Sequence, residues 1–357
     1  MSKSNFKKLG IISFVFLAVS LIVFLPKIVS AEPLATESGT APVLVVAQEA
    51  DIPLSAKTET NQEEECPYKL RLRAGALFLH REGNDHRTLI TDSFASGGNE
   101  LSNASDLDLG FDTGTDISLL LQYRKIGLEL RYFGLQEWSE SKGPQTSPGG
   151  AVVQYLTPIG NTSFPSEVSA KYTSWLNNAE CNLHYFLMER VKVFLGVRWL
   201  KLNERLLIQQ NIGPDLNLVK YNNTSRNRLW GGQIGAEGVL FGNLEKGFSI
   251  DGCVKGGYFK NDILTKATIS QSISPGGGFG ANADKNKGTF VGELGIGANY
   301  AFTRNIALTA RYQLLWLDKV ALAPEQIRKL DVLSGVSSVD CDSVLYQGVS
   351  VGLTVSF

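Results

Sequence analysis

Residues 172–199 read YTSWLNNAECNLHYFLMERVKVFLGVRW and contain two runs in which apolar and polar residues alternate. In the first run Leu183 and Tyr185 lie on one face, and His184 between them lies on the other. Because a β-strand places successive side chains on opposite faces, this period of two predicts a strand. Residues 188–190 separate the two runs and are few enough to form a tight turn between antiparallel strands.

The same alternation recurs after Pro67 in ten segments, and short and long connections between the segments take turns. Transmembrane barrels have an even number of strands, tight turns at the periplasmic rim and long loops at the outer rim. The sequence therefore predicts an all-β protein, a closed antiparallel transmembrane β-barrel of about ten strands with up-and-down topology. The short connections are residues 124–125, 188–190, 242–247 and 303–305, and the long ones are residues 82–112, 139–170, 210–225, 263–286 and 320–343. Residues 202–209 and 264–270 fit either extensions of strands above the membrane or separate hairpins, which leaves the strand count open by two.

The N-terminal residues have the pattern of an export signal. Three lysines and an apolar run over residues 9–25 precede the small residues Ser30 and Ala31. This order predicts a signal peptide over residues 1–31, with an uncleaved membrane anchor as the alternative. Residues 32–65, rich in Ala, Pro, Thr, Ser and Glu, are predicted to be a flexible periplasmic linker, and residues 66–357 the barrel.

Charge and cysteine content exclude several classes of function. The 34 basic and 35 acidic side chains nearly cancel, which gives no reason to expect a nucleic-acid partner. Cys66, Cys181, Cys253 and Cys341 are too few and too scattered for a disulfide framework, and no Cys or His cluster has the spacing of zinc ligands. We expect free thiols, with Cys181 facing lipid and Cys253 facing the lumen, and neither a metal nor a cofactor.

Aromatic residues are predicted to mark both membrane interfaces, because tyrosine and tryptophan favour the headgroup level. The ten residues from Trp175 to Tyr185 would rise about 25 Å on a tilted strand, the height of the apolar band in such barrels. The row near the short turns is Tyr68, Tyr123, Tyr185, Phe248, Tyr300 and Phe357, and the row near the long loops contains all five tryptophans, Trp138, Trp175, Trp199, Trp230 and Trp316.

The C-terminal segment VSVGLTVSF, residues 349–357, has apolar residues at every second position and ends in Phe357. This ending resembles the last strand of bacterial outer-membrane β-barrels. The stretch LRAGALFLHREGNDHRTLI, residues 72–90, is similar to β-barrel porins of the planctomycete type. The resemblance implies an exported protein of the bacterial outer membrane, whose partners are the lipid bilayer and the barrel-assembly machinery, which reads the last aromatic residue. The oligomeric state stays open.

Fourteen ionisable side chains fall on the faces predicted to point inward, and their charges nearly balance. A barrel of about ten strands is narrow, so opposite charges inside it should pair. The set is therefore either a structural salt-bridge network or the lining of a narrow, weakly selective pore. The predicted lumen-lining residues are Arg71, Arg73, Asp116, Glu129, Arg131, Glu180, His184, Lys192, Arg198, Glu237, Asp251, Lys255, Glu293 and Arg311.

These observations predict a barrel without catalysis, either a narrow porin-like channel or a structural or surface-exposed protein. The alternative is a hydrolase at the extracellular rim, with His80 or His86 as the base and Asp106 or Asp108 as its partner. The sequence has no His-x-x-x-His motif and no phosphate-binding glycine loop between a strand and a helix. We therefore assign no catalytic residue.

Overall fold

A computed structural model describes residues 68–82, 88–92, 100–147, 151–153, 166–212, 217–243, 247–272, 278–329 and 337–357. Every described residue belongs to one compact unit, Tyr68–Phe357. The predicted signal peptide and linker, like Cys66, lie outside the described residues and stay predictions.

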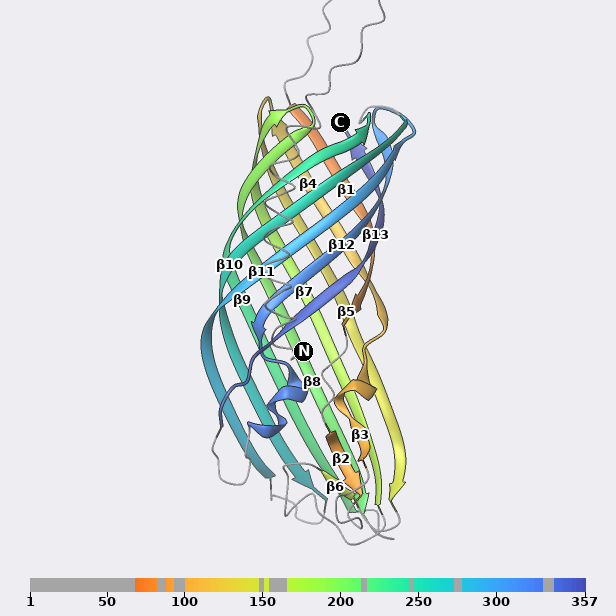
Figure 1. Cartoon of the computed structure of the whole chain (residues 1–357), viewed down its shortest axis with the longest axis vertical. Coiled ribbons are helices and arrows are strands. Elements are labelled where there is room, and N and C mark those ends of the chain that lie inside the picture. Colours follow the sequence, from red (N-terminus) through yellow and green to blue (C-terminus); the bar gives the residue numbers. More distant parts are fainter. Residues whose placement is uncertain are drawn as a thin grey trace, which may run out of the picture. The chain divides into compact units, whose positions relative to one another are not determined.

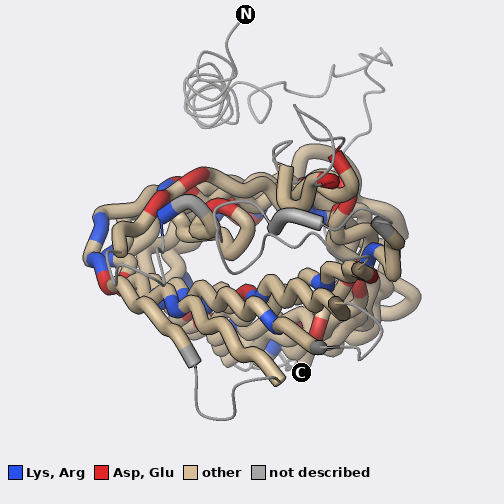
Figure 2. The backbone as a smooth tube through the Cα atoms, turned by 90° about the horizontal axis from the view of Figure 1, so that it is seen from below, with Lys and Arg blue, Asp and Glu red and all other residues tan. Residues whose placement is uncertain are grey.

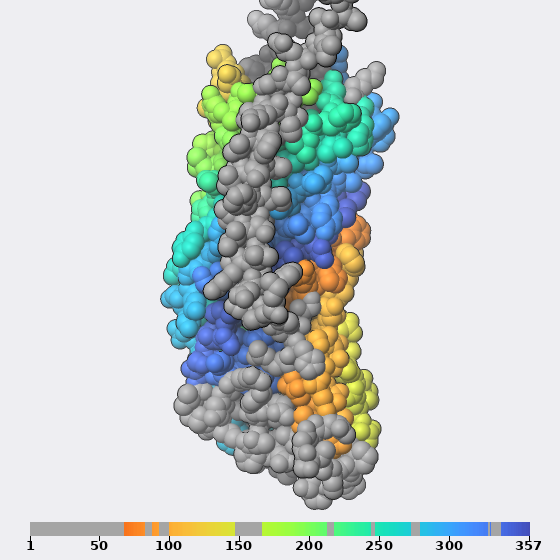
Figure 3. Space-filling view, in the orientation of Figure 1, coloured from red at the N-terminus to blue at the C-terminus, as the bar shows by residue number. Residues whose placement is uncertain are grey.

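Ten strands form a closed antiparallel barrel in which each strand pairs with the next along the barrel wall (Figure 1). The last strand pairs with the first from Arg71↔Ser356 to Arg81↔Tyr346. In Figure 3 the orange of the first strand and the dark blue of the last adjoin on the surface, and Figure 2 shows the closed ring end-on. The predicted fold and up-and-down topology are confirmed. In order the strands are β1 (Tyr68–Arg81), β4 (Phe111–Tyr123), β5 (Ile126–Ser147), β7 (Ser166–Met188), β8 (Val191–Ile212), β9 (Asn217–Gly242), β10 (Gly247–Gln271), β11 (Gly278–Ala301), β12 (Ile306–Val320) and β13 (Asp342–Ser356).

The connections at the loop end contain the remaining elements. A small sheet in the order β3-β2-β6 consists of β2 (Thr88–Asp92), β3 (Glu100–Asn103) and β6 (Ala151–Val153). Two short 3-10 helices follow β3 and β12, η1 (Ala104–Leu107) and η2 (Ala323–Arg328). No helix in the described part of the chain is both long and apolar enough to cross a bilayer.

Six neighbouring strands, β5 and β7 to β11, are longer than the sequence pattern predicted. They have 22 to 26 residues, whereas β1, β4, β12 and β13 have 13 to 15. The long loops predicted over residues 210–225 and 263–286 are therefore mostly wrong, since β8 runs to Ile212, β9 begins at Asn217, and β10 and β11 leave only a short connection.

The physical reason is a reversal of sidedness along these strands, which β8 shows most clearly. Before Trp199 the outward residues are apolar, such as Leu195, which is 61% exposed, and the inward residue Arg198 is charged. Beyond Trp199 most inward residues are apolar and fully buried, such as Leu202, whereas the outward residue Lys201 is charged. The period of two continues, but the apolar face changes sides.

Beyond the tryptophans the long strands form a tall wall whose concave side is filled by an apolar core. Helix η2 contacts β8 and β9, and η1 contacts β5 and β7. The core includes inward residues of the wall and residues of the connections, among them Leu77, Leu79, Leu89, Leu107, Leu176, Leu200, Leu206, Ile208, Leu229, Phe259, Ile263, Leu317, Ala321, Ile327 and Tyr346.

The outer wall before the tryptophans carries a ring of exposed apolar side chains. Leu128 pairs with Leu183, Leu183 with Leu195, and Leu195 with Ile234, so the ring passes from strand to strand. These four residues are between 46% and 71% exposed. Such a continuous apolar surface is unfavourable in water and suits the hydrocarbon of a bilayer.

The row of aromatic residues near the short turns is confirmed, because all six predicted members are exposed on the outer wall. In the opposite row Trp199 and Trp230 lie on facing positions of β8 and β9, with ring centroids 6.2 Å apart. Trp138 was predicted in this row, and that assignment is wrong. A register shift between Leu135 and Trp138 turns the indole inward, where it is 5% exposed and lies 6.4 Å from the ring of Tyr346.

A matched pair of substitutions on β8 tests where the bilayer lies. Leu195→Arg places a charge in the middle of the apolar ring and should destabilise the barrel by about 2–4 kcal/mol in lipid. Leu207→Arg makes the same change on the same outward face beyond Trp199, and should cost less than about 1 kcal/mol. Denaturant unfolding in vesicles measures both, and equal costs would contradict the proposed membrane level.

Candidate functional site

All fourteen predicted lumen residues lie on inward-facing strand positions. Thirteen of them, all except Arg71, form ion pairs with other members of the set. We call these thirteen residues the charge belt. Arg71 lies nearer the first residue of β1 than Arg73, is exposed, and makes no ion pair with a described residue.

Two carboxylates form the centre of the charge belt. Glu293 lies 2.8 Å from Arg131, 3.0 Å from Arg198 and 3.3 Å from Lys255. Glu180 lies 2.9 Å from Lys255, and 3.6 and 3.7 Å from the two arginines. These residues come from β5, β7, β8, β10 and β11, so the centre of the belt joins opposite sides of the wall.

One side of the belt is an alternating chain of charges that leads to β1. Both guanidinium groups of this chain share one carboxylate: Arg131 Nε lies 3.1 Å and Arg73 Nη2 2.6 Å from Asp116. Arg73 also donates to Ser350 Oγ at 3.1 Å. Each cation therefore has a counter-charge on a neighbouring strand.

The other side of the belt is built in the same way. Arg311 pairs with Asp251 and lies 3.5 Å from Glu237, which is also 3.5 Å from Lys192. In addition, the His184 imidazole lies 3.0 Å from Glu129, and its ring centroid is 4.8 Å from that of Phe194.

Neutral and aromatic residues that the sequence analysis did not assign complete the belt. Arg198 Nε donates to Asn178 Oδ1 at 2.5 Å, and Gln233 Nε2 donates to Glu180 at 2.9 Å. Phe133 lies below both central guanidinium groups, at 5.0 and 5.9 Å from its ring centroid. The inward position of these residues in the alternation was a usable signal, but the sequence prediction considered only ionisable groups.

The belt fills the lumen at its level. The side chains of Glu180 and Arg198 are 0% and 1% exposed, and those of Arg131, Lys255 and Glu293 are 5% or 6% exposed. Six acidic residues face six lysines and arginines, so the buried set is close to neutral apart from His184. Paired and hydrogen-bonded charges of this kind tolerate a confined, poorly hydrated interior.

A second polar cluster lies farther along the barrel, beyond Trp175 and Trp199. Arg81 donates to Glu204 at 2.7 Å and to the Tyr172 hydroxyl at 2.5 Å. Burial by itself would lower the pKa of Arg81, but Glu204, Tyr172 and Tyr346 together outweigh it and raise the pKa above its ordinary value. Burial raises the pKa of the Tyr172 hydroxyl well above its usual range. The cluster therefore holds one fixed charge pair and a neutral phenol.

Residues 321–327, which we call the plug segment, are bound to the inside of the wall through their backbone. The Ala323 N–H donates to Glu204 at 2.8 Å, and the Ala323 carbonyl accepts from Asn223 at 2.9 Å. The Asn227 side chain makes both bonds to the Ala321 backbone, each at 2.8 Å. Side chains on β8 and β9 thus satisfy the plug backbone, which would otherwise lie in an apolar core without partners.

The residues of the alternative hydrolase are not assembled in the described part of the chain. Asp106 accepts from the Asn103 backbone N–H at 3.0 Å and pairs with Lys142 at 2.5 Å. The His80 ring lies against the ring of Phe111, and its buried Nδ1 has no hydrogen-bond partner among the described residues. Asp108 is exposed, and His86 lies outside the described residues.

Ser350 is the serine of a G-x-S-x-G pattern at residues 348–352, which the sequence analysis missed. A nucleophilic serine in this motif requires a sharp turn between a strand and a helix. Ser350 instead lies within β13, is 2% exposed, and accepts a hydrogen bond from Arg73. Its surroundings are those of a belt residue.

The cysteines follow the sequence prediction where they are described. Cys181 is half-buried on the outer side of β7, and Cys253 is buried on the inner side of β10. Both are free thiols, as is Cys341.

Comparison with known proteins gives resemblance in fold and no family. No family model and no curated protein matches the chain. Similar solved structures include the outer-membrane protease OmpT from Escherichia coli, with a TM-score of 0.44 and 10% identity over 81% of this chain and 96% of that one. They also include a Pseudomonas aeruginosa FadL homologue (TM-score 0.27, 8% identity, 81% and 89% covered) and Acinetobacter baumannii CarO (TM-score 0.23, 13% identity, 77% and 95% covered). The protein's class, a closed ten-stranded antiparallel barrel, follows from its own strand pairing.

The charge belt is tested by Glu180→Gln. Removing this carboxylate leaves three buried cations to share Glu293, and should destabilise the barrel by about 3–5 kcal/mol. Adding Lys255→Met should recover part of that loss, because the buried charge is balanced again. The exposed pair of Lys260 and Asp262 provides the control, since Asp262→Asn should cost less than about 1 kcal/mol. Denaturant unfolding in vesicles measures these three variants and Lys255→Met alone, and additive losses for the two belt residues would contradict their coupling.

Proposed function

We propose that the protein is an integral barrel of the bacterial outer membrane that acts as a closed, non-catalytic scaffold. The ten strands cross the bilayer within the apolar ring, and the tall wall with its connections extends outside the cell. The exposed apolar ring between two rows of aromatic residues supports the membrane location.

The observation that carries the proposal is the buried charge belt across the lumen. A water-filled pore needs hydrated side chains along its wall, whereas the central belt residues are at most 6% exposed. The plug segment forms a second closure farther along, where it is bound to Glu204, Asn223 and Asn227. An ion would have to displace both.

The last residue supports assembly in the outer membrane. Phe357 exchanges two backbone hydrogen bonds with Leu70, at 2.8 and 3.1 Å, and is a 71% exposed member of the aromatic row near the short turns. We take this exposed terminal aromatic as the contact with the barrel-assembly machinery. The bilayer is then the second partner, along the apolar ring.

Lack of catalysis is supported by the roles of the polar groups that could have formed a site. Asp106 caps η1 and pairs with Lys142, and Ser350 takes part in the belt. Asp106 and Ser350 thus have structural contacts in place of a catalytic partner.

Planar-bilayer recordings separate a closed scaffold from a narrow porin-like channel. The wild-type protein, shown to be folded by heat-modifiable migration on a gel, should give no steady conductance. A steady wild-type conductance that falls when Arg131 or Lys255 is neutralised would sink the scaffold proposal and establish the channel.

Two sets of substitutions test whether the belt and the plug are the closures. The belt set changes Arg131, Arg198, Glu180 and Glu293 to Ala, which removes equal numbers of positive and negative charges. The plug set changes Glu204, Asn223 and Asn227 to Ala. Each set alone should stay silent because the other closure remains, and the combined variant should conduct. A folded combined variant without conductance would contradict this assignment.

A further inference from the structure

The outer wall beyond the tryptophans carries a basic surface on three neighbouring strands. We call it the outer basic patch, and every member lies on an outward-facing position with an exposed or half-buried side chain. Its members are Lys171 on β7, Lys201 and Arg205 on β8, and Lys220, Arg226 and Arg228 on β9.

The patch lacks acidic neighbours on the outward faces of β8 and β9. Between Trp199 and Ile212 on β8, and between Leu218 and Trp230 on β9, no described outward position holds Asp or Glu. On the next strand Asp262, the cross-strand neighbour of Arg228, is paired with Lys260 at 2.9 Å. The excess of positive charge is therefore local to β8 and β9, since the outward face of β7 carries Glu167 as well as Lys171.

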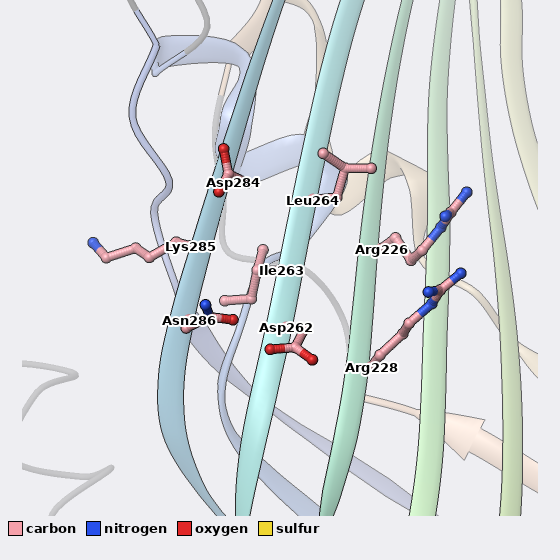
Figure 4. Close-up of a pocket in the computed structure, with 8 residues that line it drawn as sticks. All are labelled: Arg226, Arg228, Asp262, Ile263, Leu264, Asp284, Lys285 and Asn286. Carbon is pink, nitrogen blue, oxygen red and sulfur yellow. The ribbon is translucent and has the colours of Figure 1, made fainter.

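Within the patch, like charges face each other. Lys201 and Arg228 are direct cross-strand partners, an arrangement that is destabilising without a counter-ion. Neither Arg226 nor Arg228 makes an ion pair with a described residue. Figure 4 shows both guanidinium groups extending to the same side, away from Asp262 and over the neighbouring strand. This geometry leaves a shared place for an anion.

The level of the patch indicates which anion meets it. Trp199 and Trp230 face each other at the interface row, and Lys201 and Arg228 are the next outward pair on the same two strands. Two residues along a strand rise by about 7 Å, and less when the strand is tilted. Lys201 and Arg228 therefore lie just outside the tryptophans, where lipid headgroups are found, whereas Lys220, ten residues before Trp230 on β9, lies farther out.

A hollow beside the patch offers room for a headgroup. It has a volume of about 340 Å³. Its lining contains three cations, Arg226, Arg228 and Lys285, two carboxylates, Asp262 and Asp284, and the apolar side chain of Leu264, which is 40% exposed. The cations exceed the carboxylates by one, and Leu264 adds an apolar surface, which together suit a lipid phosphate beside its apolar body.

We propose that the outer basic patch binds the phosphate groups of an anionic lipid in the outer leaflet of the membrane. The inference rests on the proposed membrane location, because the tryptophan row defines the headgroup level. Free phosphate has the same charge chemistry, but only a membrane lipid is held at this level of the wall.

Binding is measured with the purified full-length chain in a non-ionic detergent, titrated with diphosphoryl lipid A and followed by native mass spectrometry. The wild type should retain the lipid. Lys201→Gln/Arg228→Gln should weaken retention about thirtyfold, because each cation near such a surface contributes a similar increment. The control Lys260→Gln/Lys266→Gln removes the same charge from exposed positions of β10 and should stay within about twofold of the wild type.

Three results would overturn the proposal. In the first, the Lys201/Arg228 variant retains the lipid as well as the wild type does; in the second, the wild type retains lipid A that lacks both phosphates equally well. In the third, an equal concentration of inorganic phosphate displaces the lipid. Without lipid, the Lys201/Arg228 variant should unfold at or above the wild-type denaturant concentration, since repulsion is relieved. A variant that instead unfolds well below the wild type would contradict the anion-site interpretation of these two residues.

Insertion into vesicles of neutral phosphatidylcholine tests the proposed function separately. A protein that fails to insert refutes the membrane barrel itself. A protein that inserts but retains no lipid A refutes only the lipid site.

Discussion

The structure depends on one constraint, the closure of the backbone hydrogen-bond ladder between β13 and β1. An open strand edge in hydrocarbon would leave N–H and C=O groups without partners, and each such group is costly. Once ten strands must close on themselves, the side chains are divided into an outer set and an inner set. The lumen is then so narrow that charged side chains from facing strands reach one another.

The charge belt also restricts how the strands can pair. Glu180 and Glu293 meet cations from β5, β8 and β10 only in the observed registers, and a slip of one residue would turn a charged side chain toward lipid. Buried ion pairs are weak evidence for stability, because desolvation offsets much of their attraction. Their contribution here is to make the wrong register much less favourable than the right one.

The sequence predicted the barrel wall well and the region outside the membrane poorly. Alternation identified ten strands, the inner charges and most aromatic positions, since each depends only on the period of two. The plug segment was beyond reach, because Ala323 meets Asn223 and Glu204 across a long stretch of chain and its own sequence carries no periodic signal. Trp138 was misplaced because a register shift changes the face of a strand without a mark in the residue pattern.

The reversal of sidedness on the long strands joins these observations. In the proposed membrane orientation, the outer wall on the short-turn side of Trp199 meets lipid, so charge goes inward and forms the belt. On the loop side of Trp199 the outer wall meets water, so apolar residues such as Leu202 go inward and form a core against the plug segment, while Lys201 goes outward. A single strand therefore follows opposite rules on either side of one tryptophan. In the proposed membrane orientation, this reversal places Lys201 and Arg228 directly beside the membrane surface. The same reversal explains why residues 210–225 and 263–286 read as loops in the sequence, although most of them continue as strands.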